Sequence, residues 1–255
     1  MWHPFTSASK TGTDHSETTP VCLPTAPKPL IQVKNFLLGL AGLCSLFASN
    51  CMANTAESVR RDGSALAQPE AEVRSTDAQD ILAWVIDSGN NGGLPFVILD
   101  KKETRVYVFQ ADGRLRGAAP ALIGSAVGDH SVPGIGERKL SAILPSERTT
   151  PAGRFVASLD RNIQNKEILW VDYDSAISLH PVITSNTKER RAQRLSSATP
   201  DDNRISYGCI NVPAVFFKKI IQPVLAGTNG IVYILPETRP VMSFFDAYVV
   251  APPEQ

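Results

Sequence analysis

The amino-acid sequence predicts a mostly β protein with minor α, in which one helix precedes the last strand. Three observations support this prediction. Short runs of β-branched and aromatic residues recur between residues 95 and 236. Turn signals such as Asp112-Gly113 separate several of these runs. One stretch with helical spacing of apolar residues, 212–225, comes just before the final apolar run.

The individual elements follow from these patterns in chain order. Asp77 can cap a short helix, "AQDILAWVIDSG", which Gly89 would end. A Gly/Pro-rich loop, 124–153, and a long polar insert, 184–203, interrupt the strand pattern that follows. The predicted strands cover 95–100, 105–110, 119–124, 154–159, 167–173, 176–180 and 230–236.

The first 53 residues have the features of an export leader. Lys34 precedes "NFLLGLAGLCSLFA", an apolar run of signal-peptide length that is too short to span a bilayer. Cys51 and Ala53 suit the small-residue positions before a cleavage point. We therefore predict a leader and signal peptide over 1–53, with the signal near 34–53, and an exported protein.

The rest of the chain divides into a tether, a domain and a tail. Residues 54–76 are polar and Ala-rich without a sustained period, which predicts a flexible tether. The predicted elements place the folded domain at 77–248 and a tail at 249–255. Basic and acidic residues both total 25, so no positive field indicates nucleic acid as a partner.

Cys209 would be the single cysteine of the exported chain, because the other three precede residue 54. A single cysteine in an oxidising compartment cannot form an internal disulfide, and is either buried and inert or a reactive thiol. His130 and His180 would be the remaining histidines.

A thiol becomes a good nucleophile when a base takes its proton and N–H groups stabilise the charge on the attacked carbonyl. His180, at the end of a predicted strand, is a better candidate base than His130, which lies in a loop. Gly208 permits a tight turn that can aim the amides of residues 207–209 at one point. The alternatives are a small buried Cys209 and a satisfied strand-end His180. One cysteine and two histidines lack the close spacing of a zinc site.

His180, followed by an S-x-G-C-x-N motif, resembles the signature of the L,D-transpeptidase catalytic domain of bacterial cell walls. "TTPAGRF" (149–155) is similar to the family's T-P-x-G-x-F stretch, and "VILDKKETRVYVFQADGRL" to its first hairpin. The resemblance covers roughly residues 94–236. The matching motif residues are Ser206, Gly208, Cys209 and Asn211.

The resemblance implies a β-sandwich-like fold with the cysteine at the end of a cleft, acting in the periplasm. Cys209 would attack the carbonyl after the third residue of a peptidoglycan stem tetrapeptide, releasing D-alanine. An amine on a neighbouring stem or an envelope protein would then take the acyl group. His180 would be the base, the Gly208/Cys209 backbone the oxyanion hole, and Ser206 would position the turn or the base. No cofactor or metal is implied.

Tyr207 stands where the family usually has histidine, and Pro181 where it has Gly or Ser. A phenol cannot carry positive charge near pH 7, so we expect a higher thiol pKa than in relatives with histidine. The insert at 184–203 would compensate by closing over the cleft. Its arginines would grip stem carboxylates, although a solvated charged segment is the alternative. The predicted substrate-binding residues are Asn211, Arg194 and Arg204.

Two other functions stay open at this point. The thioester can pass to water, which would give an L,D-carboxypeptidase or a cross-link hydrolase. The chain can also be a catalytically silent peptidoglycan-binding domain, which Tyr207 suggests.

Overall fold

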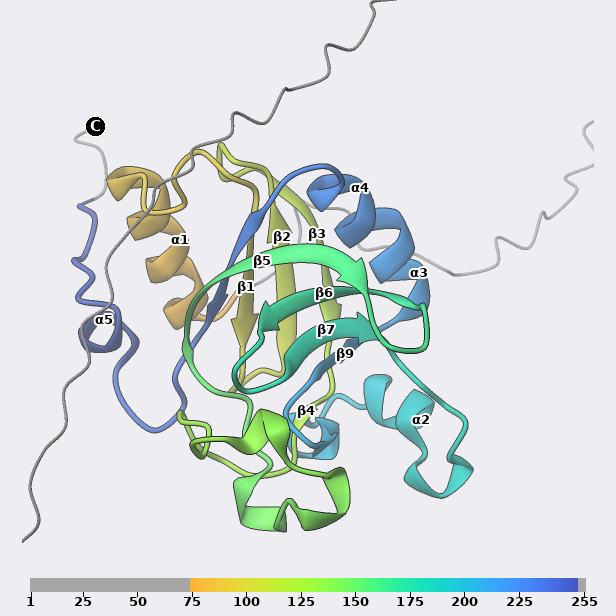
Figure 1. Ribbon diagram of the computed structural model, residues 1–255. Coiled ribbons are helices and arrows are strands. Elements are labelled where there is room, and N and C mark those ends of the chain that lie inside the picture. The colour runs from red at the N-terminus through yellow and green to blue at the C-terminus, as the bar shows by residue number, and fades with distance from the viewer. Residues whose placement is uncertain (1–73, 252–255) are drawn as a thin grey trace, which may run out of the picture. The chain divides into compact units, whose positions relative to one another are not determined.

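The computed structural model describes residues 74–251, in which eight strands form one sheet in the order β3-β2-β1-β10-β5-β6-β7-β9 (Figure 1). Neighbouring strands are antiparallel except for the parallel pairs β1–β10 and β7–β9. Strands β4 and β8 form a separate parallel pair. The strand bounds are β1 Phe96–Asp100, β2 Arg105–Phe109, β3 Leu115–Pro120, β4 Ile123–Gly124, β5 Gly153–Arg161, β6 Glu167–Asp172, β7 Ile177–Pro181, β8 Arg204–Ser206, β9 Ile210–Val212 and β10 Gly230–Ile234.

The larger hydrophobic cluster draws buried residues from both halves of the sheet, and Figure 1 shows β1, β2 and β3 behind β5, β6 and β7. A helical segment completes this cluster: α3 (Ala214–Phe216), a π-helical turn (Phe217–Ile221) and α4 (Gln222–Leu225). Its buried residues recur at helical spacing and are Phe216, Phe217, Ile221 and Leu225. The predicted fold class, mostly β with minor α, β-sandwich-like and with a helix before the last strand, is confirmed.

A second cluster covers the other face of β1, β2 and β10 with α1 (Thr76–Ser88) and α5 (Val241–Phe244). Gly89, in the left-handed conformation, ends α1 as predicted. The prediction that Asp77 caps the helix is wrong. The Ser75 hydroxyl accepts from the Ala78 N–H at 3.1 Å, so the cap and the start of the helix lie two residues earlier than predicted, and Asp77 lies in the first turn.

The predicted strand 119–124 differs most from the structure. The returning strand β3 begins at Leu115, directly after the Asp112-Gly113 turn, and ends at Pro120, because proline cannot donate to a continuing ladder. Strand β4 then pairs with β8 instead. The predicted leader (1–53) and most of the tether lie outside the described residues. Between residues 74 and 251, no helix is long and apolar enough to cross a membrane.

Candidate active site

Cys209 lies in the short turn that joins β8 to β9. The Ser206 hydroxyl spans this turn, donating to the Cys209 carbonyl at 2.7 Å and accepting from the Gly208 N–H at 3.1 Å. Ser206 therefore positions the turn. The Gly208 N–H is occupied by this bond, so the amides of Tyr207 and Cys209 are the better candidate oxyanion donors.

Gly208 is required by both conformation and space. Its φ of 132° disfavours any residue with a side chain. A Cβ at this position would lie 2.8 Å from the Thr149 carbonyl oxygen and 2.8 Å from Ile177 Cδ1. The Gly208 carbonyl also accepts from the Thr150 hydroxyl at 2.8 Å. The turn at residues 206–209, the nucleophile turn, is thus hydrogen-bonded to Thr150 and packed closely against Thr149, the first two residues of the "TTPAGRF" stretch.

Strand β7 brings His180 to the thiol. His180 pairs in register with Asn211, two residues after Cys209, on the parallel strand β9. Its Nδ1 lies 2.8 Å from the Pro181 carbonyl. A carbonyl can only accept, so Nδ1 carries a hydrogen and Nε2 is left to take the thiol proton.

The Cys209 thiol is half-buried and surrounded by polar groups of β7 and the residue before it. Its Sγ lies 3.6 Å from Ser178 Oγ and 3.6 Å from the Ala176 carbonyl oxygen. Ser178 was missed from the sequence, although strand alternation places Ser178 and His180 on one face of β7, opposite the core residues between them.

The two ionisable groups shift each other. Burial opposes the thiolate, but the hydrogen bond from His180, the charge of His180 and hydrogen bonds from Ser178 outweigh it and lower the pKa of Cys209. Burial also opposes the imidazolium, but the hydrogen bond and charge of Cys209, with the Pro181 carbonyl, raise the pKa of His180. Both shifts favour a thiolate–imidazolium pair, the reactive form of a catalytic cysteine.

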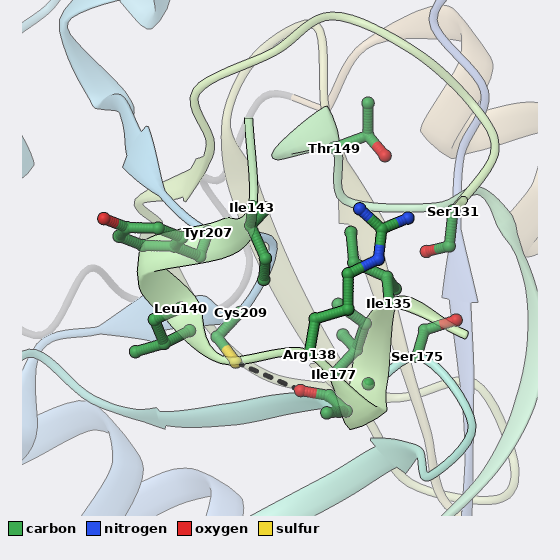
Figure 2. Close-up of a pocket in the computed structure, with 12 residues that line it drawn as sticks. Ser131, Ile135, Arg138, Leu140, Ile143, Thr149, Ser175, Ile177, Tyr207 and Cys209 are labelled. Atoms are coloured by element: carbon green, nitrogen blue, oxygen red, sulfur yellow. Dashed lines mark hydrogen bonds between the residues drawn. The ribbon is translucent and has the colours of Figure 1, made fainter. Parts of the chain in front are cut away.

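Two cavities meet at Cys209. The smaller, of about 90 Å³, is lined by residues of the loop before β5 and by Tyr207; Figure 2 shows Ile135, Arg138, Leu140 and Ile143 around the thiol. The larger, of about 950 Å³, is a mainly apolar groove that contains His180. Both cavities are lined by Leu140, Ala176 and Cys209.

The loop 125–149, not the polar insert, lies over the thiol. No residue between 184 and 203 lines either cavity, so the prediction that this insert closes over the cleft is wrong. Its helix α2 (Arg191–Leu195) is fastened elsewhere: Arg191 Nη1 donates to Asn211 Oδ1 at 2.7 Å. Arg191 still acts on the site at a distance, because its charge works to lower the pKa of His180.

The predicted substrate-binding residues have structural partners, and none of the three lines either cavity. Asn211 is 1% exposed, and its amide donates to the Cys209 carbonyl while accepting from Arg191. Arg194 donates to backbone carbonyls of residues 189 and 202. Arg204 is paired with Glu237 in a buried cluster. Asn211 thus supports the nucleophile turn. Arg194 connects the two ends of the insert, and Arg204 connects β8 to Glu237.

His130 and Tyr207 were also candidates for the site, and only Tyr207 lies at a cavity. His130 is exposed, contacts Arg239 Nη2 through its Nε2 at 2.8 Å and lines neither cavity. Tyr207 lines the small cavity, and the Arg148 guanidinium lies 4.0 Å from the centre of its ring. Arg148 and Arg138 could not be predicted from the sequence, because neither belongs to a motif. Within 74–251, no group of three or more His, Cys, Asp or Glu side chains is placed to hold a metal ion.

No family model matches the chain, and no curated protein matches it. The similar solved structures include L,D-transpeptidases. The catalytic domain of the E. faecium L,D-transpeptidase is 15% identical, with a TM-score of 0.35 over 55% of this chain and 96% of that one. An L,D-transpeptidase of Xylanimonas cellulosilytica is 13% identical, with a TM-score of 0.34 over 55% and 60%.

A further similar structure is the helical cell shape determining protein Pgp2 from Campylobacter jejuni. It is 16% identical, with a TM-score of 0.35 over 58% of this chain and 49% of that one. This chain therefore spans about half the length of Pgp2. At these identities each likeness concerns the fold alone.

Proposed function

We propose that this chain is an exported L,D-transpeptidase, in which Cys209 takes an acyl group from a peptidoglycan stem tetrapeptide and passes it to an amine. The observation that carries the proposal is the placing of Cys209 and His180 together on the larger groove, where the two cavities meet, with the thiol pKa lowered and the imidazole pKa raised. The motif around these two residues supports the choice of substrate.

The chemistry follows from the protonation of the pair. The Cys209 thiolate attacks the carbonyl carbon after the third stem residue, and the amides of Tyr207 and Cys209 stabilise the charge on its oxygen. The C–N bond then breaks, and the His180 imidazolium gives its proton to the departing amine of D-alanine. Neutral His180 next removes a proton from the incoming amine, which attacks the thioester and releases the thiolate.

Two features of the site suit transfer to an amine. A thiol reachable from two cavities can hold the acyl chain on one side while a second reactant approaches from the other. The larger groove is lined by apolar side chains, including Trp170, Ile168 and Phe217, which hold water poorly. An acyl chain that lies in this groove leaves the thioester poorly hydrated on that side, which disfavours its hydrolysis.

Product analysis tests this proposal. A tetrapeptide incubated with the protein and an amine acceptor should give the cross-linked product and free D-alanine, and Cys209→Ala should give neither. Predominant release of tripeptide in the presence of the amine would identify a hydrolase instead. No acylation of Cys209 by tetrapeptide or by a carbapenem, in a folded protein, would identify a silent binding domain.

Export is tested on the native protein by mass spectrometry of its N-terminus. The apolar run before residue 53 predicts a mature chain that starts near Asn54. A cytoplasmic protein that keeps residues 1–53 would contradict export.

A further inference from the structure

The small cavity has a cationic wall that the thioester chemistry leaves unexplained. Arg138 lines it together with the hydroxyl-bearing residues Ser131 and Ser175, and in the view of Figure 2 the Arg138 side chain lies between the thiol and these two serines. A guanidinium with neighbouring hydroxyl donors is the arrangement that recognises a carboxylate.

Arg138 is held in place through only one of its three side-chain nitrogens. Its Nη1 donates to both carboxylate oxygens of Glu147, at 3.0 Å each, and Glu147 also accepts from the Leu144 N–H at 2.9 Å. Glu147 itself does not line the cavity. Nε and Nη2 of Arg138 have no acceptor in the part of the chain that the structure describes, so they are available for a ligand.

The size of the cavity limits what this arginine can bind. A volume of about 90 Å³ corresponds to roughly three water molecules. This is room for a residue as small as alanine with its carboxylate, whereas the neighbouring groove of about 950 Å³ accepts a much larger chain. The two cavities thus divide a substrate at Cys209 into a small anionic part and a bulky part.

We propose that the small cavity binds the terminal carboxylate of the residue that leaves when Cys209 is acylated, with Arg138 as its charged donor. The inference rests on the proposed function, because it assigns the two sides of the scissile bond to the two cavities. It makes Arg138 a substrate-binding residue and explains why a C-terminal residue, with its free carboxylate, would be the one released.

The first test uses two alkylating reagents that differ in charge. Iodoacetate and iodoacetamide both react with Cys209, but only iodoacetate carries a carboxylate. The ratio of their rates should fall about tenfold in Arg138→Gln, the effect expected of one charge-assisted hydrogen bond. Arg138→Lys, which keeps the charge, should retain part of the ratio. Arg114→Gln, on an exposed hairpin arginine, should leave it within about twofold.

The ratio of the two alkylation rates distinguishes carboxylate recognition by Arg138 from a distorted loop. A disordered loop or a less nucleophilic thiol would change both rates together and leave their ratio unchanged. An unchanged ratio in Arg138→Gln would overturn the proposal, as would an equal fall in Arg114→Gln.

The second test uses stem tetrapeptides that end in D-alanine or in D-alaninamide. The wild type should acylate Cys209 faster with the free carboxylate by about tenfold in kcat/KM, and Arg138→Gln should lose this preference. Equal rates with both peptides in the wild type would refute the carboxylate site while leaving the transpeptidase function in place. A reagent ratio that depends on Arg138, without acylation by any stem peptide, would support a carboxylate site and defeat the proposed function.

Discussion

Two long segments without strands interrupt the sheet, and they have opposite relations to the thiol. The loop 125–149, before β5, lines the small cavity, and its last residue, Thr149, packs closely against Gly208 of the nucleophile turn. The insert 184–203, between β7 and β8, lines neither cavity. Its charged sequence made it the more attractive candidate for a substrate clamp, but it is the loop that lies beside the thiol.

The two segments differ in how they are anchored. The loop begins in a buried charge cluster: Lys101 Nζ, with no exposed side-chain area, donates to Asp129 Oδ1 at 2.8 Å and to the Thr150 carbonyl at 3.0 Å. The insert is held by partly exposed arginines, of which Arg191 contacts Glu189 and Asn211. Buried charges thus fix the segment that lines the small cavity, and partly exposed charges fix the insert, which lines neither cavity.

Removing the buried anchor should have the largest effect on stability. Lys101→Met leaves the buried Asp129 carboxylate without its cation and removes one of the two cations that contact Glu237, which costs about 3–5 kcal/mol of unfolding free energy. The matched control is the adjacent Lys102→Met, which breaks only an exposed pair with Asp77 and should cost less than about 1 kcal/mol. Urea unfolding measures both. Equal losses would show that the cluster does not anchor the loop.

Disturbing the contact between the loop and the nucleophile turn should have the next largest effect on stability. Gly208→Ala places a Cβ against the Thr149 carbonyl at an unfavourable φ, which should cost about 1–3 kcal/mol and slow acylation of Cys209. Gly227→Ala is the control. The φ of Gly227, 73°, is also positive, but no atom lies within 4 Å of the added Cβ. Equally fast acylation in Gly208→Ala and Gly227→Ala would show that the packing of the loop against Gly208 does not affect the reactivity of Cys209.

A substitution in the insert should have the smallest effect, and this effect should come from the loss of a charge near His180. Arg191 works to lower the pKa of His180, so Arg191→Gln should raise it and His180 should keep its proton to higher pH. Arg194→Gln, whose hydrogen bonds stay within the insert, should leave the His180 pKa where it is. An NMR titration of the imidazole distinguishes the two. A shift of the opposite sign in Arg191→Gln would refute this role.

The sequence predicts the sheet well because its strands bury alternating or continuous apolar residues, as β1 and β10 do. The motifs also led to the prediction of Cys209 and His180, two residues that line the larger groove together. The functions of Asn211, Arg194 and Arg204 were not predictable, because a sequence does not show which partners use up the hydrogen bonds of a polar side chain.

Arg138 is the opposite case, a residue at the cavity that the sequence does not single out. Its sequence neighbours are ordinary loop residues, and only the fold brings its guanidinium to the cavity beside Cys209. Strand alternation on β7 would have predicted Ser178 beside His180, but the helix caps and the loop over the thiol depend on contacts between residues far apart in the chain.

The most direct test of the account is the pH dependence of Cys209 alkylation by iodoacetamide in the wild type and in His180→Ala. His180 lowers the thiol pKa against the opposing effect of burial, so the wild type should react at a lower pH than an ordinary cysteine. In His180→Ala burial is unopposed by the imidazole, and the apparent pKa should rise; acylation should also fall by on the order of 10²–10⁴. His130→Ala should match the wild type. The same apparent pKa in the wild type and His180→Ala would contradict a catalytic Cys209–His180 pair.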